Sequence, residues 1–176
     1  MATKEDVILV NIVNSIVQSM VVPEGIGPLN YEPGRGLQIM KSINDFDNSI
    51  SSKGEKYPLI ALVLPVRERR GLGYYATVTI PRIIIATMTK SGDGVEPVLP
   101  RFAEGGNFPT VLYPLYYEFL RQCARSKNVI GGDPDAFEHE RMDNPGQQPI
   151  GQGSTDFIDS IEILNLKLIL NQIKLC

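Results

Sequence analysis

The sequence of 176 residues has no tryptophan, one histidine and two cysteines. The single histidine, His139, argues against histidine-rich metal sites and against a Ser-His-Asp triad. Cys123 and Cys176 form no CxxC pair, so neither a disulfide framework nor a zinc knuckle is expected, and this usage fits a reducing compartment. The chain therefore has few residues of the types that most often serve in catalysis, and we expect no enzyme activity, cofactor or metal.

Long apolar runs and a strong excess of charge are also missing. The longest apolar runs fall short of the ~20 residues that a membrane helix needs, and the N-terminus lacks the order of a signal peptide, so no membrane partner is expected. The net charge of −3 argues against a chain whose main task is to coat nucleic acid. The length predicts one domain spanning residues 1–176.

Apolar periodicity predicts the main elements. Apolar residues at helical spacing predict helices over 3–20 and 108–126, with Pro109 and Pro114 near the start of the second. A weaker pattern favours a short helix over 37–50. Apolar and alternating stretches predict strands over 56–65, 74–90 and 156–176.

The three strands can be arranged from their connections. A short Gly-containing connection makes the first two a hairpin, and Pro81 implies a bulge or an edge position in the second. The terminal strand should pair with 74–90 or with a neighbouring chain, with a bulge at Ile163–Leu164, where its pattern changes phase. The expected fold class is α+β, a mostly antiparallel sheet flanked by two main helices.

Glycine and proline mark long irregular segments. Residues 23–36 and 91–106 are expected to be loops. Residues 128–156 contain five glycines and three prolines with little apolar periodicity, which predicts an extended loop or binding arm. A short helical turn around 134–142 would have Asp133 as its N-cap. The residues proposed as partner contacts in and beside this arm are Val129, Asp133, Phe137, Arg141, Ile150 and Phe157.

A basic cluster at the hairpin turn offers a second candidate contact. Arg67, Arg69 and Arg70, followed by Gly71, can hold phosphates or carboxylates through bidentate hydrogen bonds. A solvated hairpin tip, a contact with a partner protein and a contact with nucleic acid all remain open for it. The third of these corresponds to a monomeric peptide- or nucleic-acid-binding module.

A small cytosolic enzyme is the remaining alternative from another class. Its site would lie among Tyr113, Glu118, Cys123 and His139. Helical spacing gives the tyrosines and Cys123 an equally simple role in the core or in a contact between subunits. Adjacent acidic residues around His139 do not converge on a metal, because neighbouring side chains on a helix diverge.

Three stretches carry a resemblance to a known group of proteins: KYPLIALVLPVRE, TIPRIIIATMTK and FPTVLYPLYYEFLRQCARS. They resemble small virion proteins from tailed bacteriophages and prophages of Bacteroides-type hosts, a group similar to head–tail joining, neck-ring and tail-terminator proteins. The resemblance covers roughly residues 55–126 and, more loosely, the terminal strand. The long segments 23–36 and 128–156 depart from the compact members of this group.

The resemblance implies a fold, a location and a set of partners. The fold would be tail-terminator-like, with an antiparallel sheet flanked by helices. The chain would be a structural virion protein, a head–tail connector, adaptor or tail terminator that joins the portal or capsid to the tail. Its partners would be copies of itself in a ring, other neck, portal or tail proteins, and double-stranded DNA bound without sequence specificity. It would be assembled in the cytoplasm of the bacterial host.

Overall fold

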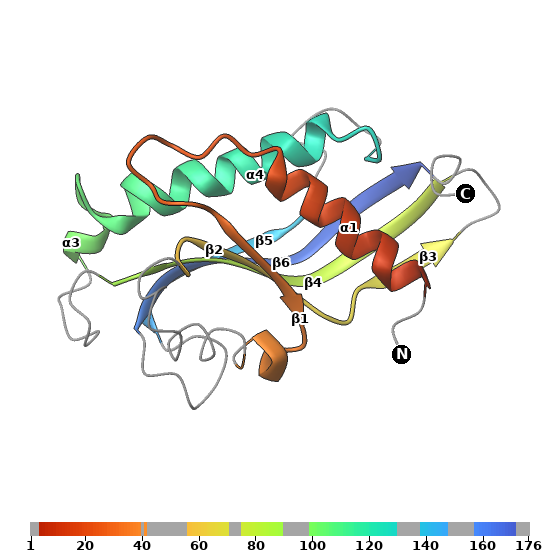
Figure 1. Ribbon diagram of the computed structural model, residues 1–176, viewed down its shortest axis with the longest axis horizontal. Coiled ribbons are helices and arrows are strands. Elements are labelled where there is room, and N and C mark those ends of the chain that lie inside the picture. Colours follow the sequence, from red (N-terminus) through yellow and green to blue (C-terminus); the bar gives the residue numbers. More distant parts are fainter. Residues whose placement is uncertain are drawn as a thin grey trace.

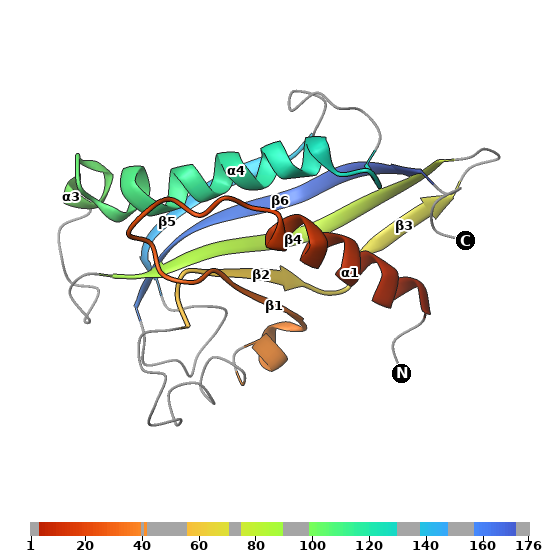
Figure 2. The same ribbon diagram turned by 45° about the horizontal axis from the view of Figure 1, so that its top comes forward.

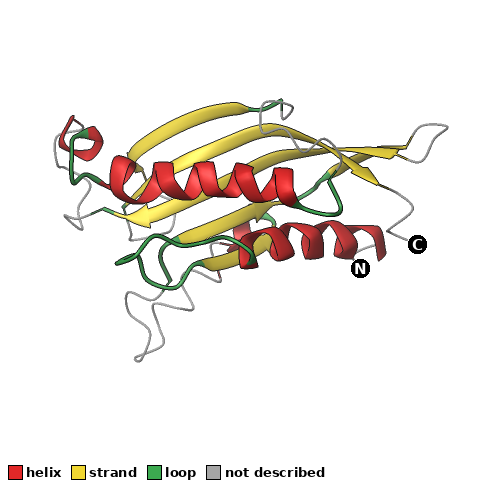
Figure 3. Cartoon of the chain, turned by 90° about the horizontal axis from the view of Figure 1, so that it is seen from above, coloured by secondary structure: helices red, strands yellow, loops and turns green. Residues whose placement is uncertain are grey.

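The computed structural model shows an α+β protein in which helices cover one face of a mixed six-stranded sheet (Figure 1). Helices α1 (Lys4–Gln18) and α4 (Tyr113–Arg125) lie side by side on that face, as the view from above shows (Figure 3). The structure describes residues 4–39, 41, 56–70, 75–89, 99–129, 138–147 and 157–171.

Two strands of 14 residues, β4 (Tyr75–Met88) and β6 (Ile158–Asn171), form the centre of the sheet. The strand order is β1-β2-β4-β6-β5, and β3 pairs with β4 on the same side as β2. The β1–β2 pair is parallel and every other pair is antiparallel. The predicted pairing of the terminal strand with 74–90 is therefore confirmed. The outer strands are β1 (Asn30–Gly34), β2 (Leu59–Val63), β3 (Arg67–Arg70) and β5 (Glu140–Gln147).

The predicted change of phase in the terminal strand is present, but both central strands share it. Ile80 pairs with Leu166 and Arg82 with Leu164, so Pro81 lies opposite Asn165, which has a φ of 54°. Pro81 is on a central strand rather than an edge. Its missing N–H is tolerated because β3 pairs only as far as Thr79, whereas β2 begins to pair at Arg82.

The larger core lies between the sheet and the two helices. Helix α1 contributes the apolar face that its spacing predicts, and Phe108, Leu112, Leu115 and Phe119 fill the space under the second helical segment. Because β4 and β6 change phase together at Pro81 and Asn165, both strands direct apolar residues toward the helices on either side of this point. A smaller cluster covers part of the opposite face: Ile39, Tyr57, Leu59, Ala61, Ile84, Ala86 and Ile158.

Helix 108–126 is confirmed with one difference at its start. Residues Phe108–Leu112 form a π-helical turn, η1, before α4 begins at Tyr113. Pro109 occupies the first turn of η1, where a missing N–H costs no intrahelical hydrogen bond. Pro114 follows directly after the π-helical turn, in which the Tyr113 N–H bonds to the Phe108 carbonyl.

Several expectations for the irregular segments were wrong. Residues 30–34 form β1 although 23–36 was expected to be a loop, and they can do so because Pro33 lies on an edge strand. The region 91–106 contains a short helix, α3 (Leu99–Phe102). Residues 140–147 form β5 rather than part of a loop or a helical turn. The hairpin pairing of β2 with β4 is confirmed, but β3 lies between them in sequence. Most of the expected helix 37–50 lies outside the described residues.

Candidate functional site

The basic cluster lies on an edge strand instead of at a hairpin tip. Arg67 and Arg69 in β3 are exposed and pair with Thr79 and Thr77 of β4. These two arginines point to the face of the sheet opposite α1 and α4, because the alternate positions of β4 face the core. The backbone of Arg70 continues the strand, and Gly71 lies outside the described residues.

Part of the predicted arm 128–156 is folded into the domain. Val129 is buried and forms an isolated bridge to Leu170, so its side chain belongs to the core. Phe157 is half-buried and its carbonyl accepts a hydrogen bond from the Thr89 amide at the end of β4. Arg141 lies in β5. Three further residues proposed as contacts lie outside the described residues: Asp133, Phe137 and Ile150.

A polar and aromatic cluster fastens β5 to helix α4. The guanidinium of Arg141 forms two hydrogen bonds to Asp143, both 2.9 Å long, and lies over the ring of Tyr113 at 4.9 Å. The Tyr113 hydroxyl donates to Asp143 at 3.1 Å, and Tyr116 Oη is 2.6 Å from His139 Nε2. Burial, reinforced by the Asp143 hydrogen bond, raises the pKa of Tyr113 above its usual value. Asp143 neutralises Arg141 within the chain. The contacts of both residues with Tyr113 attach the edge strand β5 to α4.

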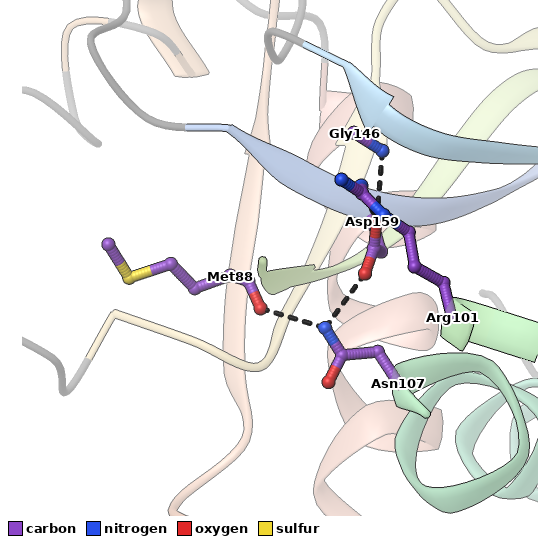
Figure 4. Close-up of polar contacts among 5 residues, drawn as sticks. All are labelled: Met88, Arg101, Asn107, Gly146 and Asp159. Carbon is purple, nitrogen blue, oxygen red and sulfur yellow. Dashed lines mark hydrogen bonds and ion pairs between the residues drawn. The ribbon is translucent and has the colours of Figure 1, made fainter. Parts of the chain in front are cut away.

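A buried ionic network connects α3, η1 and the sheet (Figure 4). Asp159 is 1% exposed and accepts three hydrogen bonds, from Arg101 Nη1 at 2.7 Å, Asn107 Nδ2 at 2.8 Å and the Gly146 amide at 2.8 Å. Asn107 also donates to the Met88 carbonyl at 3.0 Å. The network therefore joins the ends of β4, β5 and β6 to the segment that leads into α4.

Gly146 is required at this network for two separate reasons. Its φ of 63° lies in the left-handed region, where a side chain is strained. A Cβ at this position would also collide with the guanidinium of Arg101. The glycine thus allows β5 to turn over the arginine and to donate its amide to Asp159.

A second ionic group lies on the face opposite α1 and α4. Glu162 is 5% exposed and accepts hydrogen bonds from Arg82 at 2.5 and 2.6 Å and from Asn144 at 2.9 Å. These residues come from β6, β4 and β5, so the group holds three neighbouring strands together. Its only signal in the sequence is charge inside strong strand patterns.

The residues of the enzyme alternative lie in structural positions. Cys123 is fully buried in the helix-side core, and burial raises the pKa of its thiol to about 12. A thiol with that pKa is uncharged at neutral pH, whereas nucleophilic attack needs the thiolate. Glu118 accepts a hydrogen bond from the Val21 amide at 3.0 Å and from Gln122 at 2.7 Å, which fixes the end of α1 to α4. Burial raises its pKa, but hydrogen bonds from Gln122, Val21 and Arg121 outweigh burial and lower it overall.

The described part of the chain offers few other candidate sites. Among the described residues, no group of three or more histidine, cysteine, aspartate or glutamate side chains could hold a metal ion. No helix in the described part of the chain is both long and apolar enough to cross a membrane. A cavity of about 230 Å³ adjoins the buried network and is lined in part by Arg101, Asn107 and Asp159.

Comparison with known proteins identifies no family for the chain. No protein-family model, no curated protein and no solved structure matches the chain. In the described part of the chain, the edge strands β1, β3 and β5 are the positions on the sheet that are open to a partner.

Proposed function

We propose that the chain is a structural virion protein, the subunit of a ring in the neck or tail of a tailed bacteriophage. As a head–tail connector, adaptor or tail terminator, it joins the portal or capsid to the tail around the DNA channel. The resemblance of KYPLIALVLPVRE, TIPRIIIATMTK and FPTVLYPLYYEFLRQCARS to such proteins is one support. The α+β architecture, with an antiparallel core under two helices, is compatible with the tail-terminator-like fold.

The observation that carries the proposal is the pair of open borders at β3 and β5, on opposite sides of the central strands β4 and β6 (Figure 2). Strand β1 is a third edge strand, beside β2. Among the described residues, β3 pairs only with β4, and β5 pairs only with β6. Each strand therefore presents a row of backbone N–H and C=O groups on its outer side, which favours pairing with another chain. The two borders differ from each other, as a head-to-tail contact requires, and a head-to-tail contact that closes gives a ring.

The β5 border is also fixed firmly to the rest of the fold, as an assembling edge requires. Strand β5 is fastened to α4 through Arg141 and Asp143, and to β6 through Asp159 and Glu162. A rigid edge loses little conformational freedom when it meets a neighbour, so more of the contact energy stabilises the assembly.

The location of the chain in phage particles tests the proposal. Particles are induced from the bacterial strain that carries the gene, purified, and analysed by mass spectrometry and by gold labelling with an antibody to the chain. The proposal predicts several copies per particle and label at the junction of head and tail. Deletion of the gene should yield separate heads and tails, restored by a plasmid copy. Purified infectious particles that lack the chain would overturn the proposal.

A further inference from the structure

The β3 border carries positive charge on one face of the sheet. Arg67 and Arg69 are exposed and lie on the face opposite α1 and α4, in register with Thr79 and Thr77. Glu68 alternates with them, so it lies on the side of α1 and α4. At this border the face opposite the two main helices therefore presents two guanidinium groups next to open backbone hydrogen-bonding positions.

The β5 border carries negative charge on the same face. Glu140 is exposed and pairs with Leu164, and Met142 pairs with Glu162, which places both on the face opposite α1 and α4. Glu138, just before the strand, is 75% exposed and forms a solvent-exposed ion pair with Lys167 of the same face, 2.6 Å long, which offsets part of its charge. Arg141, the cation of this strand, lies on the opposite face, where Asp143 neutralises it.

Strand directions fix how two copies can meet. Each neighbour in the series β3, β4, β6, β5 is antiparallel to the next. When a second copy continues the sheet in the same orientation, its β5 runs antiparallel to β3 of the first. Antiparallel strands form the more stable ladder, and the basic and acidic corners then lie on the same face.

Charge also disfavours the two symmetric alternatives. A twofold contact of β3 with β3 brings Arg67 and Arg69 against the same arginines. A twofold contact of β5 with β5 brings Glu138 and Glu140 together when its axis passes near His139, at the start of the strand. Like charges opposite each other destabilise a strand pair. The opposite charges of β3 and β5 favour the head-to-tail contact, which generates rings or filaments instead of dimers.

We infer that a second copy of this chain docks its acidic β5 border, at Glu138 and Glu140, against the basic β3 border at Arg67 and Arg69. This inference rests on the proposed function, since it names the contact through which the ring subunits join. Association should weaken as salt concentration rises, because the charged groups on both borders are exposed.

Complementary charge reversal tests the contact. One variant, R67E/R69E, makes both borders acidic, and the other, E138R/E140R, makes both basic. Each alone should associate about tenfold or more weakly than the wild-type chain, because attraction at two positions becomes repulsion. An equimolar mixture should assemble again, because the acidic β3 of one variant meets the basic β5 of the other, and the reverse. Mass by light scattering and by sedimentation gives the readout.

Controls distinguish loss of this contact from a general effect of net charge and from unfolding of the variants. The variant R35E/R125E changes the net charge by the same amount as R67E/R69E, at exposed residues of other elements, and should assemble like the wild-type chain. Circular dichroism and thermal unfolding check that each variant is folded. Restored assembly in the mixture is itself proof that both variants retain the native fold.

Three results would overturn the inference. They are a wild-type chain that stays monomeric up to about 1 mM in low salt, reversed variants that assemble as well as the wild-type chain, and a mixture that does not recover. The last two leave the proposed function intact if the chain is present at the particle neck. Absence of the chain from particles, with the mixture still recovering, would reject the proposed function and keep the contact.

Discussion

Replacing Asp159 with asparagine should destabilise the fold by about 3–5 kcal/mol, the usual cost of breaking a buried ion pair from one side. Asp159 is 1% exposed and Arg101 is 5% exposed, so little water can replace the lost charge. Three donors converge on the carboxylate, from Arg101, Asn107 and the Gly146 amide. The asparagine oxygen can retain some of these bonds, but its NH2 group meets donors, and the Arg101 charge remains buried.

Equilibrium unfolding in urea measures this loss. D159N should lower the midpoint without changing the slope, since a change in slope would mean an altered unfolded or native state. K167M is the matched control, because it removes the exposed Glu138–Lys167 pair, which should contribute less than about 1 kcal/mol. The double variant R101M/D159L removes both buried charges and should recover part of the stability.

The result for D159N decides whether the network holds the fold. A loss below about 1 kcal/mol for D159N, equal to that of the exposed pair, would refute the argument that Arg101 is buried with Asp159 as its essential partner. A larger loss in R101M/D159L than in D159N would contradict the same argument, because it would mean that the pair is favourable beyond its packing.

Three further predictions concern other described features. G146A should cost about 2 kcal/mol or more in urea unfolding, from its left-handed backbone and its collision with Arg101, and a neutral effect would contradict the geometry. In a C176S background, Cys123 should react with a thiol reagent only after denaturant is added, because it is buried with a pKa of about 12, so rapid labelling of the native chain would be inconsistent with the core. Burial raises the pKa of Tyr113 and Tyr116 above 10.0, so stability is fully present below pH 10 and falls as pH rises beyond it, because the unfolded chain loses these protons first. Tyrosinate absorbance that develops at pH 10 in the native wild-type protein and is lost in Y113F/Y116F would contradict this.

The elements with strong periodicity could be predicted from the sequence. The helix near the N-terminus, the strands that became β2, β4 and β6, and the helix around Leu115 and Phe119 each have an apolar pattern that is sufficient by itself. The change of phase in β6 was visible in the spacing of Ile163 and Leu166. Its matching irregularity at Pro81 was open as either a bulge or an edge, since one strand does not show what pairs with it.

The edge strands could not be predicted, because their partners stabilise them. Strand β1 contains Pro33 and Gly34, and β5 contains Pro145 and Gly146, which are typical of loops. Strand β5 is stable where it is because Asp159 and Glu162 of β6 and Tyr113 of α4 form hydrogen bonds to it. These contacts join residues far apart in the sequence, so no local pattern could reveal them.

The candidate contact residues were predicted in part. The arginines of β3 stood out as a cluster, and their placement on an exposed edge agrees with a role in partner contacts without testing it. Glu138 and Glu140 attracted attention only as neighbours of His139, because their importance depends on which border of the sheet they occupy. The buried pair of Arg101 and Asp159 had no signal beyond a charge inside an apolar strand pattern.

A cryo-electron microscopy reconstruction of the neck of purified particles tests the central claim most directly. The account predicts a closed ring of identical subunits into which the described fold fits, with β3 of one subunit antiparallel to β5 of the next. A neck fully accounted for by other chains, with this chain found only outside assembled particles, would contradict it.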